Sequence, residues 1–212
     1  MFIIPCKYSA GSPILKCIEQ IKKYYPDEDI VVVDSDSDDK SYFDLIRNDV
    51  LDIIEGNHNY EIGAYIKAYE AHPNQEKYYC IHDSLMINKR FDALKAYNIL
   101  ITVQWFDGFW DTEEQKNYAK SIMGEYVNRP FVGCFGSIMF CHGFILERIY
   151  KFFKDKKLPT NKLESCAYER ILGIFLGNIV GCNMYNALQG QHITIEHPYD
   201  TTYVNKIFIR RE

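Results

Sequence analysis

The run Ile30 to Val33 is the feature that most constrains the fold of this chain. Its four β-branched residues are continuous, whereas a strand with one face in water alternates apolar and polar side chains. A continuous run is typical of a parallel strand that is covered on both faces. The acidic stretch "DSDSDD", residues 34–39, follows directly. Carboxylates are therefore expected just beyond the carboxyl end of this strand.

Strand-like and helix-like segments alternate through about the first 85 residues. The strand-like runs are Phe2–Pro5, Ile30–Val33, Leu51–Ile54 and Lys77–Ile81, and the segments between them carry apolar residues at helical spacing. This order predicts an α/β fold with a mixed, mostly parallel central sheet, helices on both faces and a Rossmann-like N-terminal half. Sheets of this kind bind ligands at the carboxyl ends of their strands. Four polar residues fall at that edge: Lys7, Asp34, Asp36 and Asp83.

The second half of the sequence is less regular. It predicts a strand over 100–105, a helix over 113–127, a glycine-interrupted apolar run over 131–141, a helix over 144–153 and a last long helix that starts near residue 163. No domain linker separates the two halves. We therefore expect one domain over 1–212, with a nucleotide-binding half over 1–90.

Composition excludes several classes of function. A formal charge of −5 with thinly spread basic residues argues against a nucleic-acid partner. Seven cysteines, an odd number without a C-x-x-C pair, indicate a reducing cytoplasm and no zinc site. Neither a signal-peptide pattern nor about 18 consecutive apolar residues occurs, so we expect neither secretion nor a transmembrane segment. The oligomeric state is not legible from the sequence.

The strand ends carry a resemblance to a known family. A first strand with Pro-Cys-Lys, a second that ends in Asp and a fourth that ends in His-Asp-Ser resemble the nucleotide-sugar half of GT-A glycosyltransferases. The resemblance implies that the stretch "DSDSDD" lies at the nucleoside and not at a metal, although a solvated turn is the alternative for its acids. The implied nucleoside contacts are Pro5, Cys6, Lys7, Tyr8, Asp34, Ser35 and Asp36.

The same resemblance implies a divalent metal, Mn²⁺ or Mg²⁺, beside the donor diphosphate. The stretch His82-Asp83-Ser84 stands at the metal position with one carboxylate where the family usually has two. Asp83 is the expected ligand, because one hard carboxylate can hold the ion when diphosphate oxygens, water and a distant His complete its shell. His192 and His197 are the candidates for that His. A strand-end cap is the alternative role for Asp83, and His82 could be a ligand, a ribose contact or a packed residue.

Other stretches match the family at single positions. Gly63 and Lys67 resemble a helix glycine and basic residue that approach the donor, although packing is the alternative for the glycine. Lys206, Arg210 and Arg211 in the tail are available to the diphosphate. Residues 91–212 would form the acceptor-binding half, where Gly136-Ser137, Asp107 and the aromatic residues around it suit a platform for an acceptor sugar, although core packing is the alternative. Asp107 is also a candidate catalytic carboxylate.

The acceptor-side segment predicts the catalytic base. Glu164 and Arg170 match the family's acid and Arg at six-residue spacing, with Ser165 in place of a second acid. If the enzyme inverts, Glu164 is the expected general base for the acceptor hydroxyl; if it retains, the carboxylate would orient hydroxyl groups. Glu169 is the reserve, and an exposed helix charge is the alternative reading of Glu164.

The sequence thus predicts a metal-dependent glycosyltransferase that moves a hexose or deoxyhexose from a UDP-sugar to a hydroxyl group of a glycan. The stretches "PCKYSAG" and "IHDSLMIN" look closest to a capsid-glycan glycosyltransferase domain of large algal DNA viruses (chlorella viruses), which would place the protein in the host cytosol. The alternatives are a nucleotidyltransferase of related fold and a non-catalytic nucleotide- or glycan-binding module. Sugar, acceptor and stereochemistry are not legible.

Overall fold

A seven-stranded mixed sheet forms the centre of the protein. The computed structural model describes residues 1–9, 11–90, 100–102, 105–186 and 204–206. Strand order is β10-β6-β9-β4-β1-β2-β3, and within this sheet β9 alone runs antiparallel to its neighbours. The strands span Phe2–Cys6 (β1), Ile30–Asp34 (β2), Asp52–Ile54 (β3), Lys77–Cys80 (β4), Leu100–Thr102 (β6), Met139–His142 (β9) and Met184–Asn186 (β10). The predicted α/β class with a mostly parallel sheet is confirmed.

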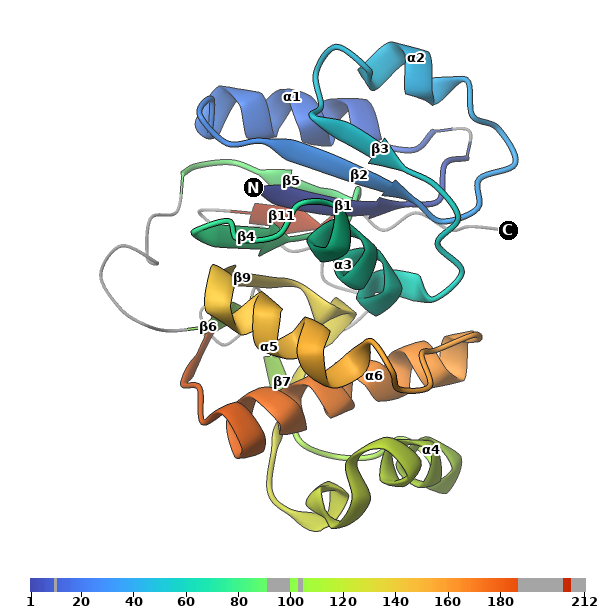
Figure 1. Cartoon of the computed structure of the whole chain (residues 1–212), viewed down its shortest axis with the longest axis vertical. Coiled ribbons are helices and arrows are strands. Elements are labelled where there is room, and N and C mark those ends of the chain that lie inside the picture. Colours follow the sequence, from blue (N-terminus) through green and yellow to red (C-terminus); the bar gives the residue numbers. More distant parts are fainter. Residues whose placement is uncertain (10, 91–99, 103–104, 187–203, 207–212) are drawn as a thin grey trace.

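Both faces of the sheet are buried, as the continuous β-branched run predicts. Successive residues of β2 point to opposite faces, so Val31 and Val33 join one apolar core while Ile30 and Val32 join the other. Figure 1 shows the two layers of helices that cover these faces. The helices are α1 (Ile14–Tyr24) and α2 (Tyr42–Ile46) on one face and α3 (Tyr60–Ala71), α5 (Gly143–Phe153) and α6 (Lys162–Ile174) on the other, with α4 (Glu113–Met123) outside α6.

Local sequence explains where these helices lie and end. In α1 the buried residues Ile14, Cys17, Ile18 and Ile21 recur at intervals of three and four, which places them along one side of the helix. The α-helix predicted over 113–127 ends earlier, because Gly124 has φ +58° and ψ −138°, far from the α-helical values of about −63° and −42°. Residues Gly124–Asn128 continue as a 3-10 turn.

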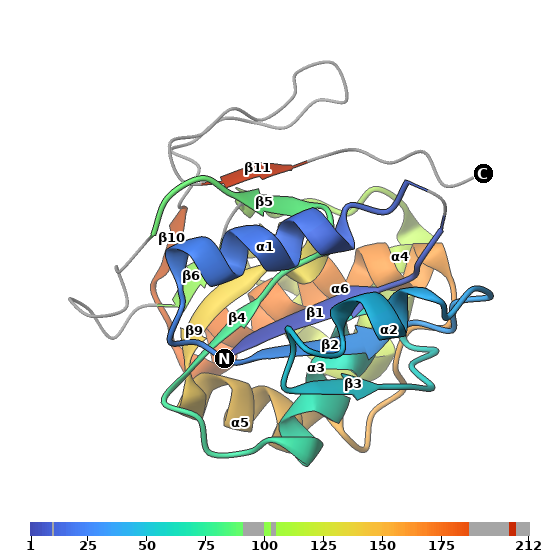
Figure 2. The same ribbon diagram turned by 90° about the horizontal axis from the view of Figure 1, so that it is seen from above.

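Two small antiparallel pairs extend beyond the central sheet. The single strand predicted over 100–105 is wrong: β6 ends at Thr102, and β7 (Trp105–Asp107) pairs instead with β8 (Val132–Cys134). The other pair joins β5 (Leu85–Ile87) to β11 (Val204–Lys206), which brings part of the tail against the N-terminal half. Figure 2 shows this pair beside α1. None of the helices in the described ranges is long and apolar enough to cross a membrane.

The topology brings the polar strand ends together. Strands β1, β2 and β4 are parallel, and Cys6 is the register partner of Asp34, so their carboxyl ends meet at one edge of the sheet. Helix α6 reaches this edge from the second half because it packs on β8 and on the turn Phe135–Ser137 that follows. The site can therefore draw on both halves of the chain.

Gly173 tests the packing that holds α6 in place. A Cβ atom at residue 173 would lie 1.8 Å from the carbonyl oxygen of Val132, whereas a Cβ at Gly177 would meet nothing within 4 Å. We expect Gly173→Ala to destabilise the fold by about 1–3 kcal/mol, because backbone must move to admit the methyl group. Urea denaturation gives the measurement. The matched variant Gly177→Ala should be neutral or slightly stabilising, and equal losses in both variants would contradict the account.

Candidate active site

Asp34 organises the end of β2 from inside the protein. Its side chain is 1% exposed, and its two carboxylate oxygens accept hydrogen bonds from the Tyr42 hydroxyl (2.8 Å) and the Ser37 amide (3.1 Å). The Ser37 hydroxyl in turn accepts a bond from the Tyr8 amide at 2.7 Å, and the Tyr8 ring stacks on Tyr42 with centroids 4.6 Å apart. Asp34 thereby fixes the loop that follows β1 through its neighbours.

The more accessible residues at this edge surround that buried carboxylate. Lys7 and Asp36 are exposed, and Tyr8 and Ser35 are half-buried. Asp36 has φ +60° and lies 3.6 Å from His58, and Ser35 accepts a hydrogen bond from Asn57 at 3.0 Å. The predicted nucleoside residues are thus gathered at one edge, with Pro5 and Cys6 behind them in β1. Their role toward a nucleotide stays a prediction.

Asn57 accounts for the glycine near the start of α3. Its side chain is 1% exposed and donates to Ser35 and to the Tyr60 carbonyl oxygen, while its own oxygen accepts from the Asn59 amide. A Cβ atom at Gly63 would lie 2.5 Å from that oxygen and 2.5 Å from the Cβ of Asn59. Close packing thus explains Gly63, and Lys67 lies half-buried one turn further along α3.

Asp83 lies at the end of β4 and is also buried. It is 2% exposed, and one carboxylate oxygen lies 3.3 Å from the Ser12 hydroxyl and 3.6 Å from the Cys6 sulfur. Ser84 beside it is buried as well. Asp83 therefore ties the loop after β1 to the end of β4, which is also the contact expected of a strand-end carboxylate with a structural role.

The described residues do not by themselves form a metal site. Within the described ranges no group of three or more His, Cys, Asp or Glu side chains could hold an ion. The other predicted ligands, His192 and His197, lie outside the described residues, as do Arg210 and Arg211. Lys206 belongs to β11, where it pairs with Leu85. Metal binding by Asp83 stays a prediction.

The backbone of one residue, Gly136, joins the end of β4 to α6. The carbonyl oxygen of Gly136 lies 2.6 Å from Nε2 of His82, and the amide of Gly136 donates to Oε1 of Glu169 at 2.9 Å. Because a carbonyl oxygen only accepts, Nε2 of His82 carries the proton. Gly136 has φ +60°, and a Cβ there would lie 3.0 Å from the His82 ring, so both backbone and packing favour glycine. His82 thus faces the second half of the chain.

The Glu169 carboxyl group has the electrostatics of an acid–base residue. Burial raises its pKa to about 7, and the nearby Glu61 adds to the rise, against the lowering effects of the Gly136 amide, Lys162 and Arg170. The side chain is 14% exposed, so it keeps a path to a ligand. A carboxyl group with a pKa near neutral pH can accept and release a proton under physiological conditions.

Glu164 has the contacts of a helix-cap carboxylate. Its Oε2 accepts hydrogen bonds from the Thr160 amide (2.8 Å) and hydroxyl (2.9 Å), and its Oε1 pairs with Lys157 at 2.6 Å. Asn161, the N-cap of α6, accepts from the Glu164 amide. Burial acts to raise the pKa of Glu164, but the bonds from Lys157 and Thr160 outweigh it and hold that pKa below its usual value. Its predicted role as base stays a prediction, and the geometry favours Glu169.

Arg170 fixes the aromatic loop next to Glu169. Its guanidinium donates to the Phe109 carbonyl oxygen (2.8 Å) and to Asp111 (2.7 Å), stacks over Phe106 and lies 3.9 Å from Glu169. The Phe109 ring remains 55% exposed. Asp107 lies in β7, paired with Val132, and its side chain is outside the description. The predicted acceptor platform is thus held beside the carboxylate, although its role stays a prediction.

Sequence reasoning missed Glu61 and Tyr42. Glu61 accepts a hydrogen bond from Ser165 at 3.3 Å and lies 3.5 Å from Nε2 of His82. An acid in the first turn of a helix is common, because helix N-termini favour negative charge, so its position alone carried no signal. Tyr42 looks in sequence like an ordinary apolar position of a short helix. Only the fold brings these residues to the strand ends.

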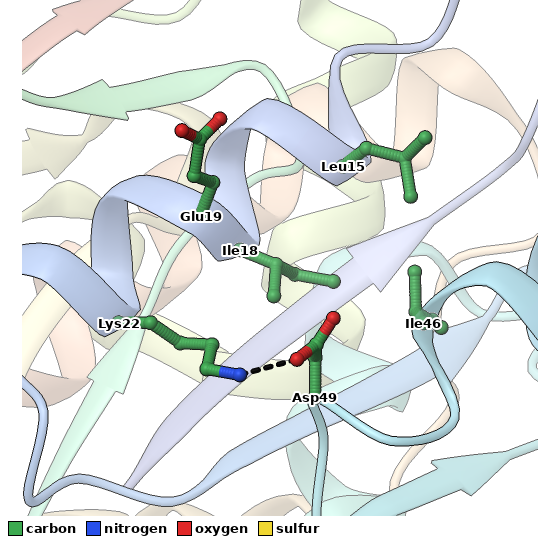
Figure 3. A pocket seen from close by; sticks show the side chains of 6 residues that line it. All are labelled: Leu15, Ile18, Glu19, Lys22, Ile46 and Asp49. Carbon is green, nitrogen blue, oxygen red and sulfur yellow. Dashed lines mark hydrogen bonds and ion pairs between the residues drawn. The ribbon is translucent and has the colours of Figure 1, made fainter.

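A hollow elsewhere on the molecule lacks this chemistry. Figure 3 shows its lining: Leu15, Ile18, Glu19, Lys22, Ile46 and Asp49, with an ion pair between Lys22 and Asp49. Its volume is about 290 Å³, and it lies between α1 and the end of α2. None of the buried acids at the strand ends lines it. The acid–base chemistry therefore belongs to the sheet edge and not to this hollow.

Comparison with known proteins gives a structural similarity but no family. No family model and no curated protein matches the sequence. A crystal structure of S. aureus TarS in complex with UDP is similar, with a TM-score of 0.49, 15% identity and coverage of 82% of this chain. The aligned part is 53% of that TarS chain, so this chain spans about half its length. Function therefore has to be argued from the side chains at the site.

The two glutamates of α6 should respond oppositely to loss of charge. A pKa raised from 4.5 to about 7 means that the fold loses stability as pH rises from about 4.5 to about 7, so Glu169→Gln should gain up to about 3 kcal/mol at pH 8 and little at pH 5. The lowered pKa of Glu164 means that its charge stabilises the fold at both values, so Glu164→Gln should lose about 1 kcal/mol at each. Thermal unfolding at pH 5 and pH 8 measures both, and a pH-independent effect of Glu169→Gln would contradict the account.

Proposed function

We propose that this protein is a glycosyltransferase of the GT-A type that transfers a hexose or deoxyhexose from a UDP-sugar to a hydroxyl group of a glycan. One observation carries the proposal. At the carboxyl edge of a mostly parallel sheet, a buried carboxyl group with a pKa near 7 is held by a backbone amide and faces a loop with an exposed aromatic ring. Open sheets of this kind bind ligands at that edge.

Glu169 is the general base of the proposed reaction. The acceptor hydroxyl gives its proton to the Glu169 carboxylate, and an oxygen lone pair forms the new bond to the anomeric carbon. The bond from that carbon to the diphosphate breaks, and its electron pair leaves with UDP. The Gly136 amide holds Oε1 of Glu169 at 2.9 Å, so one oxygen is fixed by a donor. This direct displacement inverts the anomeric centre.

The proposed donor contacts lie at the ends of β1 and β2. Tyr8, Lys7, Ser35 and Asp36 are the accessible residues there, and the buried Asp34 orders them from behind. The preference for uridine rests on the sequence resemblance. For the metal, Asp83 with His192 or His197 and the donor diphosphate remain the proposed ligands, and no step above depends on the ion. A bound Mn²⁺ or Mg²⁺ would neutralise charge on the departing diphosphate.

The acceptor side favours a saccharide. An exposed aromatic face suits a sugar ring, and Phe109 is held beside Glu169 through Arg170. A viral capsid glycan as acceptor rests on the two sequence stretches alone. A cytoplasmic location fits the seven cysteines, all of which are free. A binding module without catalysis, and a nucleotidyltransferase, are the outcomes to be separated by experiment.

A panel of nucleotide-sugars tests the proposal directly. With Mn²⁺ present we expect release of UDP from at least one UDP-sugar in the presence of a glycan acceptor, and no comparable release from GDP-sugars. Glu169→Gln should lose on the order of 10²–10⁴-fold in turnover, as expected for loss of a general base, whereas the matched Glu164→Gln should keep most of its activity.

Binding measurements separate this outcome from loss of folding. UDP at about 100 times its dissociation constant should add about 2.7 kcal/mol to the stability of wild type and both variants, a melting shift on the order of 5–10 °C. A shift without turnover in wild type would favour the binding module. Full activity of Glu169→Gln together with an inactive Glu164→Gln would assign the base to Glu164.

Phe109 provides an independent test of the acceptor side. Phe109→Ala should lower kcat/KM for the acceptor about 3–10-fold, because it removes a stacking surface, while donor binding stays unchanged. The control is Phe144→Ala. Phe144 is 47% exposed but follows the end of β9, whose last residue His142 pairs with Lys77 at the opposite edge of the sheet. Equal losses in the two variants would count against the platform.

A further inference from the structure

Glu61 is not one of the residues that the sequence resemblance matched, yet it contacts His82 at the end of β4 and Ser165 on α6. Its Oε2 accepts the Ser165 hydroxyl at 3.3 Å, and Ser165 precedes Glu169 by one turn of α6. Its Oε1 lies 3.5 Å from Nε2 of His82. Ser165 and Glu169, four residues apart on one helix, lie on the same side of α6. The Glu61 carboxylate therefore stands on the side of α6 that carries the base.

The contacts form a closed circuit. Glu61 on α3 contacts His82, His82 donates to the Gly136 carbonyl oxygen, and the Gly136 amide donates to Glu169. Ser165 returns the circuit from α6 to Glu61. The exposed fractions of the side chains of Glu61, His82 and Glu169 are 23%, 16% and 14%, so water screens these contacts only in part. Displacing Glu61 would remove one contact from His82 and one from Ser165.

We propose that Glu61 is a positioning residue, which holds the His82–Gly136 contact and, by its negative charge, keeps Glu169 ready to take a proton; the inference rests on the proposed function. Among the described residues, the charged and titratable groups that act on Glu169 are Glu61 from α3, Lys162, Cys166 and Arg170 from α6, and Cys134 from β8, with His82 bonded to the Gly136 carbonyl oxygen. Lys162 and Arg170 favour the ionised carboxylate. Glu61 is the acid that opposes them.

The sign of the effect follows from like charges. Ionised Glu61 disfavours ionisation of Glu169, so removal of that charge makes Glu169 ionise at lower pH. Glu61→Gln should shift the acid side of the pH profile of kcat/KM to lower pH and reduce the plateau about 10–100-fold, because the base is no longer held in place. A helix residue with a merely structural role would not move the pH profile.

The experiment compares Glu61→Gln with Glu70→Gln in the full chain. Both substitutions remove one carboxylate from α3, but Glu70 is exposed and lies nine residues along the helix, about 13 Å away. Carboxyl-carbon NMR follows the titration of Glu169, assigned by its loss in Glu169→Gln, and does not require turnover. The expected result is a lower midpoint in Glu61→Gln and an unchanged one in Glu70→Gln.

The readout separates this inference from the proposed function. Identical midpoints in wild type, Glu61→Gln and Glu70→Gln overturn the inference even if the enzyme turns over a UDP-sugar. A lower midpoint in Glu61→Gln supports the coupling even if no sugar is transferred. If Glu61→Gln fails to fold, Glu61→Asp is the second variant, because its side chain is one methylene shorter and its charge lies further from Glu169. The midpoint should then shift less but in the same direction. An unchanged midpoint in Glu61→Asp would overturn the inference.

Discussion

The site depends on the two backbone hydrogen bonds of Gly136. Its carbonyl oxygen accepts from His82 at the end of β4, and its amide donates to Glu169 on α6. The two groups come from opposite halves of the chain, so neither half alone contains the arrangement. Glycine is favoured here because the backbone has φ +60° and a Cβ atom would lie only 3.0 Å from the His82 ring. One residue without a side chain thereby sets the distance between donor edge and acceptor helix.

The Glu169 carboxyl group that Gly136 holds is unfavourable to ionise, although the Gly136 amide favours its charged form. Burial and Glu61 raise the pKa of Glu169 to about 7, which means that the fold is weakened when the group ionises. Glu164, five residues earlier, shows the opposite design, because Lys157 and Thr160 satisfy its carboxylate and its charge supports the start of α6. In α6 the glutamate with a lowered pKa, Glu164, has a structural role, whereas the glutamate with a raised pKa, Glu169, is the candidate for chemistry.

Much of the N-terminal half was predictable from sequence. Continuous burial of Ile30–Val33 requires cover on both faces, and helical spacing of apolar residues fixes α1, so the alternation of strands and helices and the polar edge follow from local patterns. The second half was less predictable because its strands are only three or four residues long and glycines interrupt them. The chain changes sheets between β6 and β7 because β7 pairs with β8, which is a tertiary contact. The end of α4 depends on the backbone angle of Gly124.

The site was predictable by position but not by contact. Sequence gathers Asp34 and Asp83 at the strand ends, yet burial turns both toward internal donors such as Tyr42 and Ser12, which no local pattern reveals. The choice between Glu164 and Glu169 likewise depends on what surrounds each carboxylate. Spacing along a helix gives the turn on which an acid lies, whereas its pKa depends on residues from α3 and from the Gly136 turn.

A crystal structure with bound UDP is the sharpest test, because the proposal states where the nucleotide binds. We expect the uracil to lie beside Tyr8 at the ends of β1 and β2 and the diphosphate to point toward the end of β4. Glu169 should then face the side of the donor that remains open to the acceptor. UDP bound in the hollow between α1 and α2, or at the opposite edge of the sheet, would contradict the account.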